Sequence, residues 1–128
     1  MAKIENNTSN TKKIMVVDDE TDVLSIVGIV LEENGFEVDT FEDPVVALKS
    51  YRAGVYDLLI LDIKMPEMDG FELYDRIKKI DDNAKVCFLT ASEMYYKNSR
   101  KLDKDLLIQK PIANEDLVEE ISKILSRV

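Results

Sequence analysis

The 128-residue chain contains no histidine and no tryptophan, and its one cysteine is Cys87. A lone cysteine cannot form an intramolecular disulfide, and without histidine or a second cysteine a zinc site is not expected. The lack of histidine also excludes a histidine general base and every catalytic triad built on one. Any chemistry must therefore use carboxylates, lysine, hydroxyls and bound ions.

Long apolar runs are missing as well. No run of about 18 apolar residues is present, so no transmembrane helix is expected. The N-terminal segment MAKIENNTSNTKK lacks the apolar centre of a signal peptide, so we expect a cytoplasmic protein without a membrane partner. Positive charge is scarce, since 17 Lys and Arg stand against 26 Asp and Glu, a net charge of −9. Because nucleic-acid backbones bind cationic faces, this balance argues against direct nucleic-acid binding.

The composition is that of one folded domain. Hydrophobic residues make up 45% and charged residues 34% of the chain, a balance typical of globular rather than disordered proteins. We expect residues 1–11 to form a flexible polar tail and residues 12–128 to form the domain. At this length we expect no separate output domain.

Short apolar runs alternate with longer amphipathic stretches along the domain. Five strands are expected, at 14–17, 36–41, 58–61, 86–89 and 106–108. Helices are expected over 21–34, from Pro44 to Gly54, behind the capping residue Asp69, within 92–104 and from Asn114. Cys87 falls inside the fourth strand and is expected to be a packed core thiol. Strands that alternate with helices imply an α/β fold, a parallel sheet with helices on both faces.

Four of the expected strands end in polar residues, which are Asp18 with Asp19, Asp62, Thr90 and Lys110. Taken singly, an aspartate at such a position is usually a turn or cap residue. Because the carboxyl ends of parallel strands meet at one edge of the sheet, these side chains are expected to converge. Converging carboxylates repel one another, and Mg²⁺ relieves this while keeping positions open for phosphate oxygens. The pattern therefore indicates an Mg²⁺-dependent phosphoryl site with a carboxylate nucleophile.

Four motifs in chain order resemble the receiver domain of two-component response regulators. They are VVDDE (16–20), LLILDIKMPEMDG (58–70), FLTAS (88–92) and QKP (109–111). The resemblance covers about residues 12–127 and implies a flavodoxin-like doubly wound (βα)5 sandwich, with the strand order 2-1-3-4-5 known from chemotaxis members of the family. It also implies a stand-alone signalling protein whose only chemistry is its own phosphorylation and dephosphorylation.

The resemblance assigns roles to the acidic residues. Asp62 would be the phosphoacceptor, taking a phosphoryl group from the phosphohistidine of a sensor histidine kinase or phosphotransfer protein. Asp19 and Asp62 would bind Mg²⁺ (or Mn²⁺) directly, and Asp18 would bind it mainly through water. The backbone carbonyl of Lys64 would be a further ligand of the ion.

The resemblance also assigns residues to the phosphoryl group. Thr90 would hydrogen-bond to it and swing toward it, and Lys110 would pair with its charge. Lys64 and Ser92 occupy the two positions that tune the lifetime of the phosphoryl group in this family. Family members usually have a cis peptide before the proline that follows the lysine, so a cis bond is expected at Lys110–Pro111.

Two features depart from the family pattern. Many receivers carry an aromatic switch residue three positions before the lysine, where this chain has Leu107. Only nineteen residues, 91 to 109, separate Thr90 from Lys110, and no glycine follows Gly70. We therefore expect the helix within 92–104 to be short or irregular, and the coupling of Thr90 to position 107 to be altered.

Other functions fit the residues less well. The departures favour, as the alternative, a receiver-fold interaction module that is not phosphorylated, and Mg²⁺ binding separates the two interpretations. A haloacid-dehalogenase phosphatase would need D-x-D after the first strand, where this chain has Asp18-Asp19-Glu20. A flavodoxin-like FMN carrier would need hydroxyls and glycine there. We expect a switch that acts on an unknown downstream protein, as a monomer or a weak phosphorylation-dependent dimer.

Overall fold

The computed structural model describes residues 11–91, 107–110 and 113–126. Its strands are β1 (Lys13–Val17), β2 (Glu37–Phe41), β3 (Leu58–Asp62), β4 (Val86–Thr90) and β5 (Leu107–Gln109). Its helices are α2 (Thr21–Glu33), α3 (Pro44–Ser50), α4 (Gly70–Ile80) and α6 (Asn114–Ser126). All neighbouring strands pair in parallel, in the order β2-β1-β3-β4-β5. The predicted fold class and strand order are confirmed.

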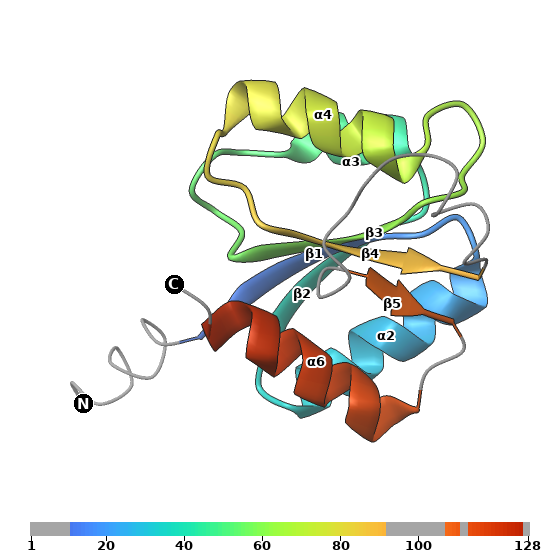
Figure 1. Cartoon of the computed structure of the whole chain (residues 1–128), viewed down its shortest axis with the longest axis vertical. Helices are drawn as coiled ribbons and strands as arrows, with labels where there is room; N and C mark the ends of the chain where they lie inside the picture. Colours follow the sequence, from blue (N-terminus) through green and yellow to red (C-terminus); the bar gives the residue numbers. More distant parts are fainter. Residues whose placement is uncertain (1–10, 92–106, 111–112, 127–128) are drawn as a thin grey trace.

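Helices cover both faces of the sheet, with α3 and α4 on one face and α2 and α6 on the other (Figure 1). Alternate residues of one strand enter different cores, as β1 illustrates. Met15 and Val17 pack in the core that α3 and α4 cover, whereas Ile14 and Val16 pack in the core beneath α2 and α6. Because the central strands are buried on both faces, they read as unbroken apolar runs in the sequence.

One predicted helix end is wrong. Helix α3 ends at Ser50 rather than near Gly54, because Tyr51 takes an extended conformation (φ −66°, ψ 137°). The Tyr51 ring is buried, and its hydroxyl donates a 2.7 Å hydrogen bond to Asp81 Oδ2. Gly54 instead adopts a positive φ of 81° in the loop that follows. Burial of an aromatic side chain therefore ends the helix before its glycine.

The amino edge of the sheet carries a pair of tyrosine–aspartate hydrogen bonds. Tyr56 donates to Asp39 Oδ2 at 2.7 Å, as Tyr51 donates to Asp81. The two tyrosine rings stack with their centroids 5.9 Å apart. Burial, with the hydrogen bond to Asp39, raises the pKa of Tyr56 to about 12, so its hydroxyl remains a donor at neutral pH.

Cys87 is fully buried within β4, which confirms the predicted core thiol. Burial raises the pKa of this thiol to about 12. The predictions for the helix within 92–104, for Ser92 and for a cis bond at Lys110–Pro111 lie outside the described residues. Among the helices that are described, none is long and apolar enough to cross a membrane.

Candidate phosphoryl site

The carboxyl ends of β1, β3, β4 and β5 meet around one cavity of about 500 Å³. The polar residues predicted from the strand ends gather here, since Asp19, Asp62, Thr90 and Lys110 line the cavity and Asp18 is buried directly beneath it. Asp62 and Thr90 are the last residues of β3 and β4, so the strands themselves fix their positions. The predicted convergence of these side chains is therefore present in the structure.

Lys110 forms ion pairs with three carboxylates at the carboxyl edge of the sheet. Its Nζ lies 2.8 Å from Glu20 Oε1, 2.9 Å from Asp18 Oδ2 and 3.5 Å from Asp62 Oδ1. Its backbone N–H donates to the carbonyl of Thr90 at 2.7 Å, which ties the lysine to the end of β4. Burial would lower the pKa of Lys110, but the hydrogen bond to Glu20 and the neighbouring aspartates raise it above its ordinary value. The ammonium is therefore charged at neutral pH.

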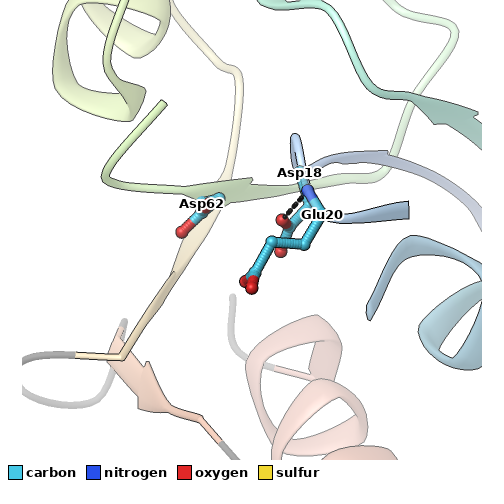
Figure 2. Close-up of side chains that lie close together, drawn as sticks. All are labelled: Asp18, Glu20 and Asp62. Atoms are coloured by element: carbon cyan, nitrogen blue, oxygen red, sulfur yellow. Dashed lines mark hydrogen bonds between the residues drawn. The ribbon is translucent and has the colours of Figure 1, made fainter. Parts of the chain in front are cut away.

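Asp18 has one satisfied and one unsatisfied oxygen. Its side chain is fully buried, and Oδ1 accepts a 2.9 Å hydrogen bond from the backbone N–H of Glu20. Within the described residues, Oδ2 accepts no hydrogen bond of good geometry, although the Lys110 ammonium lies close to it. A buried carboxylate oxygen without a donor is costly unless a cation neutralises it. Oxygens of Asp18, Glu20 and Asp62 lie within 4.8 Å of one another, so the residues fit a hard divalent cation (Figure 2).

Asp62 is the titratable group most affected by this arrangement. Its side chain is only 6% exposed, and burial together with the charge of Asp18 raises its pKa to about 7. The ammonium of Lys110 opposes this rise, and a hydrogen bond with Asp19 adds to it. A bound cation would lower the pKa, because it stabilises the charged carboxylate.

The structure adds Glu20 to the predicted residues. From the sequence this residue was only part of the VVDDE motif, and nothing in the motif predicts an ion pair with a lysine 90 positions later. Asp19 is exposed and lines the cavity, but the three oxygens nearest one another come from Asp18, Glu20 and Asp62. Direct ligation by Asp19 therefore stays a prediction.

The backbone at the start of α4 packs closely against the end of β3, where the candidate site lies. Gly70 donates its N–H to the carbonyl of Ile63 at 2.8 Å. A Cβ at Gly70 would lie 3.1 Å from Ile63 Cα and closer still to the carbonyl oxygen of Asp62. Asp69 caps α4 by accepting the N–H of Glu72 at 2.8 Å, as its position before the helix predicted. The start of α4 thus lies directly against the backbone of the candidate acceptor.

Glu67, in the loop between β3 and α4, has a positive φ of 71°. A residue with a Cβ adopts this left-handed backbone conformation at a cost in free energy. We expect Glu67→Gly to raise the free energy of unfolding by about 0.5–1 kcal/mol, the relief of left-handed strain less the entropy of glycine. Urea denaturation followed by far-UV circular dichroism measures this. Glu67→Ala is the matched control, because it removes the charge and keeps the Cβ. Equal stability of the two variants would contradict the prediction.

The family model of the response regulator receiver domain matches residues 14–122. The response regulator receiver protein CpdR of Brucella abortus is 34% identical over 89% of this chain and 97% of its own length. The chemotaxis protein CheY of Treponema pallidum is 36% identical over 88% of this chain and 82% of its own length. The crystal structure of the response regulator TrrA from Thermotoga maritima, in complex with Mg²⁺-BeF, shares 36% identity and a TM-score of 0.77, covering 89% of this chain and 99% of TrrA.

A parallel α/β sheet with an acidic cavity and a lysine at its carboxyl edge is the arrangement expected of a phosphoryl-accepting signalling domain. The chain belongs to the response regulator receiver family, which confirms the predicted resemblance. It is a two-component signalling domain rather than a conventional enzyme. Receiver domains bind Mg²⁺ in an acidic cluster of the kind found here, and they interact with histidine kinases or phosphotransfer proteins.

Proposed function

We propose that Asp62 accepts a phosphoryl group from the phosphohistidine of a sensor histidine kinase or phosphotransfer protein, and that this switches binding of a downstream protein. The observation that carries the proposal is the position of Asp62. Its carboxylate ends β3 at the cavity, nearly buried, with the Lys110 ammonium 3.5 Å away. A nucleophile held there reaches the phosphorus of a docked phosphoimidazole, while the rest of the donor stays outside.

The proposed step exchanges one phosphorus bond for another. An Asp62 carboxylate oxygen forms a bond to phosphorus as the phosphorus–nitrogen bond breaks, and the electron pair of that bond stays on the imidazole nitrogen. The imidazole leaves as a neutral ring if its other nitrogen already carries a proton, and otherwise it takes a proton from solvent. Mg²⁺ (or Mn²⁺), held by Asp19, Asp62 and the Lys64 carbonyl and by Asp18 mainly through water, would neutralise charge on the phosphoryl oxygens. The ammonium of Lys110 supports the same charge from the β5 side.

The residues around the acceptor would govern the switch that follows. We infer that Thr90, buried at the end of β4, hydrogen-bonds the new phosphoryl group. Leu107 is half-buried against the core beneath α3 and α4, and as a leucine it offers no polar edge to couple with Thr90. We propose that the signal therefore leaves this site without the aromatic switch used by many relatives.

Lys64 is exposed and lines the cavity, and we infer that its ammonium holds the phosphoryl group and hinders an attacking water. Lys64→Asn is then expected to shorten the half-life of the phosphorylated protein several-fold, which intact mass measured over time after removal of the donor would record. An unchanged half-life would contradict this role of the Lys64 ammonium. Lys49→Asn, at an exposed position of α3, is the matched control.

The acceptor is tested by incubating the protein with Mg²⁺ and acetyl phosphate and measuring its intact mass. The wild type is expected to gain one phosphoryl group, and Asp62→Asn none. Asp82→Asn removes one exposed carboxylate elsewhere and should behave like the wild type. If the wild type binds Mg²⁺ but gains no phosphoryl group from acetyl phosphate or from a phosphorylated histidine kinase, the unphosphorylated interaction module becomes the better description.

A further inference from the structure

The Lys110 ammonium lies closer to Glu20 and Asp18 than to Asp62, the proposed acceptor. It contacts Glu20 at 2.8 Å and Asp18 at 2.9 Å, and Asp62 is the most distant of its three acidic neighbours at 3.5 Å. The lysine side chain is 12% exposed, so few solvent molecules compete for its donors. Its orientation is therefore set mainly by these carboxylates.

The backbone of Glu20 is fixed beside this contact, while its side chain is 61% exposed. Its backbone N–H donates to Asp18 Oδ1 at 2.9 Å (Figure 2). Its carbonyl accepts the N–H of Leu24 at 3.0 Å, which begins α2. The residue occupies the N-cap position, yet its side chain makes no capping hydrogen bond. It instead extends across the cavity mouth to Lys110, which lies 90 positions later in the chain.

We propose that Glu20 competes with the phosphoryl group for Lys110, and so acts as a positioning residue that holds the ammonium nearer to Glu20 and Asp18 than to Asp62 until phosphorylation. The inference rests on the proposed function of Asp62 and goes beyond it. An ammonium has three donors, and the Glu20 pair uses one of them. Movement of the ammonium toward a phosphoryl group on Asp62 lengthens its 2.8 Å contact with Glu20, and Glu20 then faces the new negative charge.

Two roles are open to Glu20, competition for Lys110 and ligation of a cation, and they predict opposite effects of removing its charge. If Glu20 competes for Lys110, removing its charge strengthens phosphoryl binding. If Glu20 is instead a cation ligand, as its distance to Asp18 and Asp62 allows, removing it weakens Mg²⁺-dependent binding. Beryllofluoride with Mg²⁺ is a suitable probe, because it mimics the phosphoryl group without a covalent step and the relative TrrA is described in complex with Mg²⁺-BeF.

The experiment measures beryllofluoride affinity by ¹⁹F NMR, at a Mg²⁺ concentration that saturates each variant. Glu20→Gln is expected to bind about three- to tenfold more tightly than the wild type, the effect of removing one nearby like charge. Glu33→Gln removes an exposed charge at the far end of α2 and should leave the affinity unchanged. In a Lys110→Met background, the effect of Glu20→Gln should fall below about twofold, since the two residues would act as one unit.

A second measurement needs neither Mg²⁺ nor beryllofluoride. In ¹⁵N-lysine-labelled protein, the Nζ resonance of Lys110, assigned by its loss in Lys110→Met, should shift in Glu20→Gln and not in Glu33→Gln. Equal or weaker beryllofluoride binding by Glu20→Gln, or an unmoved Nζ resonance, would overturn the inference. A wild type that binds no beryllofluoride and gains no phosphoryl group would overturn the proposed function of Asp62 itself, which is a distinguishable result.

Discussion

Gly70→Ala is expected to slow phosphorylation of Asp62 by about 100-fold, because a displacement of about 1 Å at a reacting group has this effect. The added Cβ would collide with the backbone carbonyl of Asp62 and lie 3.1 Å from Ile63 Cα. Backbone atoms at the end of a central strand cannot rotate away as a flexible side chain can. Either α4 or the end of β3 must therefore shift, and the Asp62 carboxylate shifts with it.

The same substitution should lower the free energy of unfolding by about 1–3 kcal/mol, the usual cost of overpacking. Acetyl phosphate kinetics with Mg²⁺ measure the first effect, and urea denaturation measures the second. Gly28→Ala is the matched control: it lies inside α2, and its Cβ would meet only the side-chain atom Thr40 Cγ2 at 3.3 Å. Phosphorylation of Gly70→Ala at the wild-type rate would show that the loop can absorb a methyl group.

Asp62→Asn is expected to be more stable than the wild type by about 2–4 kcal/mol at pH 8 with a chelator present, from the shift of its pKa from 3.8 to about 7. At pH 4 the carboxyl is protonated in the folded chain and about half ionised in the unfolded chain, so the advantage is small. Between these values the unfolded chain loses its proton first. The stability of the wild type therefore falls as pH rises from about 4 to 7, whereas asparagine has no charge to bury.

Urea denaturation at pH 4, 6 and 8, followed by circular dichroism, tests this pH dependence. Added Mg²⁺ should reduce the difference at pH 8, because the cation stabilises the ionised carboxylate of the wild type and has less charge to bind in the variant. Asp82→Asn, which removes a charge from an exposed turn, should show no comparable gain. Equal stability of Asp62→Asn and wild type at pH 8 in chelator would mean that Lys110 already neutralises the site.

The strand ends were predictable because buried parallel strands read as apolar runs that stop at a polar residue. Asp18, Asp62, Thr90 and Lys110 each follow or end such a run, and the topology of parallel strands brings them to one edge. No side-chain geometry was needed for that step. The sheet order was available only through the resemblance, since spacing along the chain does not say which strands are neighbours.

Features that depend on distant contacts were not predictable. Glu20 precedes an expected helix and carries no sequence signal of a distant partner, and only the folded chain brings Lys110 to within 2.8 Å of it. The sequence misplaces the end of α3 because Gly54 is a turn signal, whereas the buried Tyr51, hydrogen-bonded to Asp81, decides where the helix ends. Local patterns thus locate the elements, and tertiary contacts set their ends and partners.

The two tyrosine–aspartate hydrogen bonds make the amino edge of the sheet more rigid than its carboxyl edge. Tyr51 and Tyr56 join the loops at the amino edge to Asp81 and Asp39, through neutral hydroxyl donors that do not titrate near physiological pH. One ion pair, Lys13 Nζ to Asp39 Oδ2 at 3.5 Å, adds to these bonds. The opposite edge is held mainly by the charges around Lys110, whose balance changes whenever a cation or a phosphoryl group binds. Changes in salt, Mg²⁺ or phosphorylation should therefore move backbone at the carboxyl edge while the amino edge keeps its register, so that the molecule deforms from one side only.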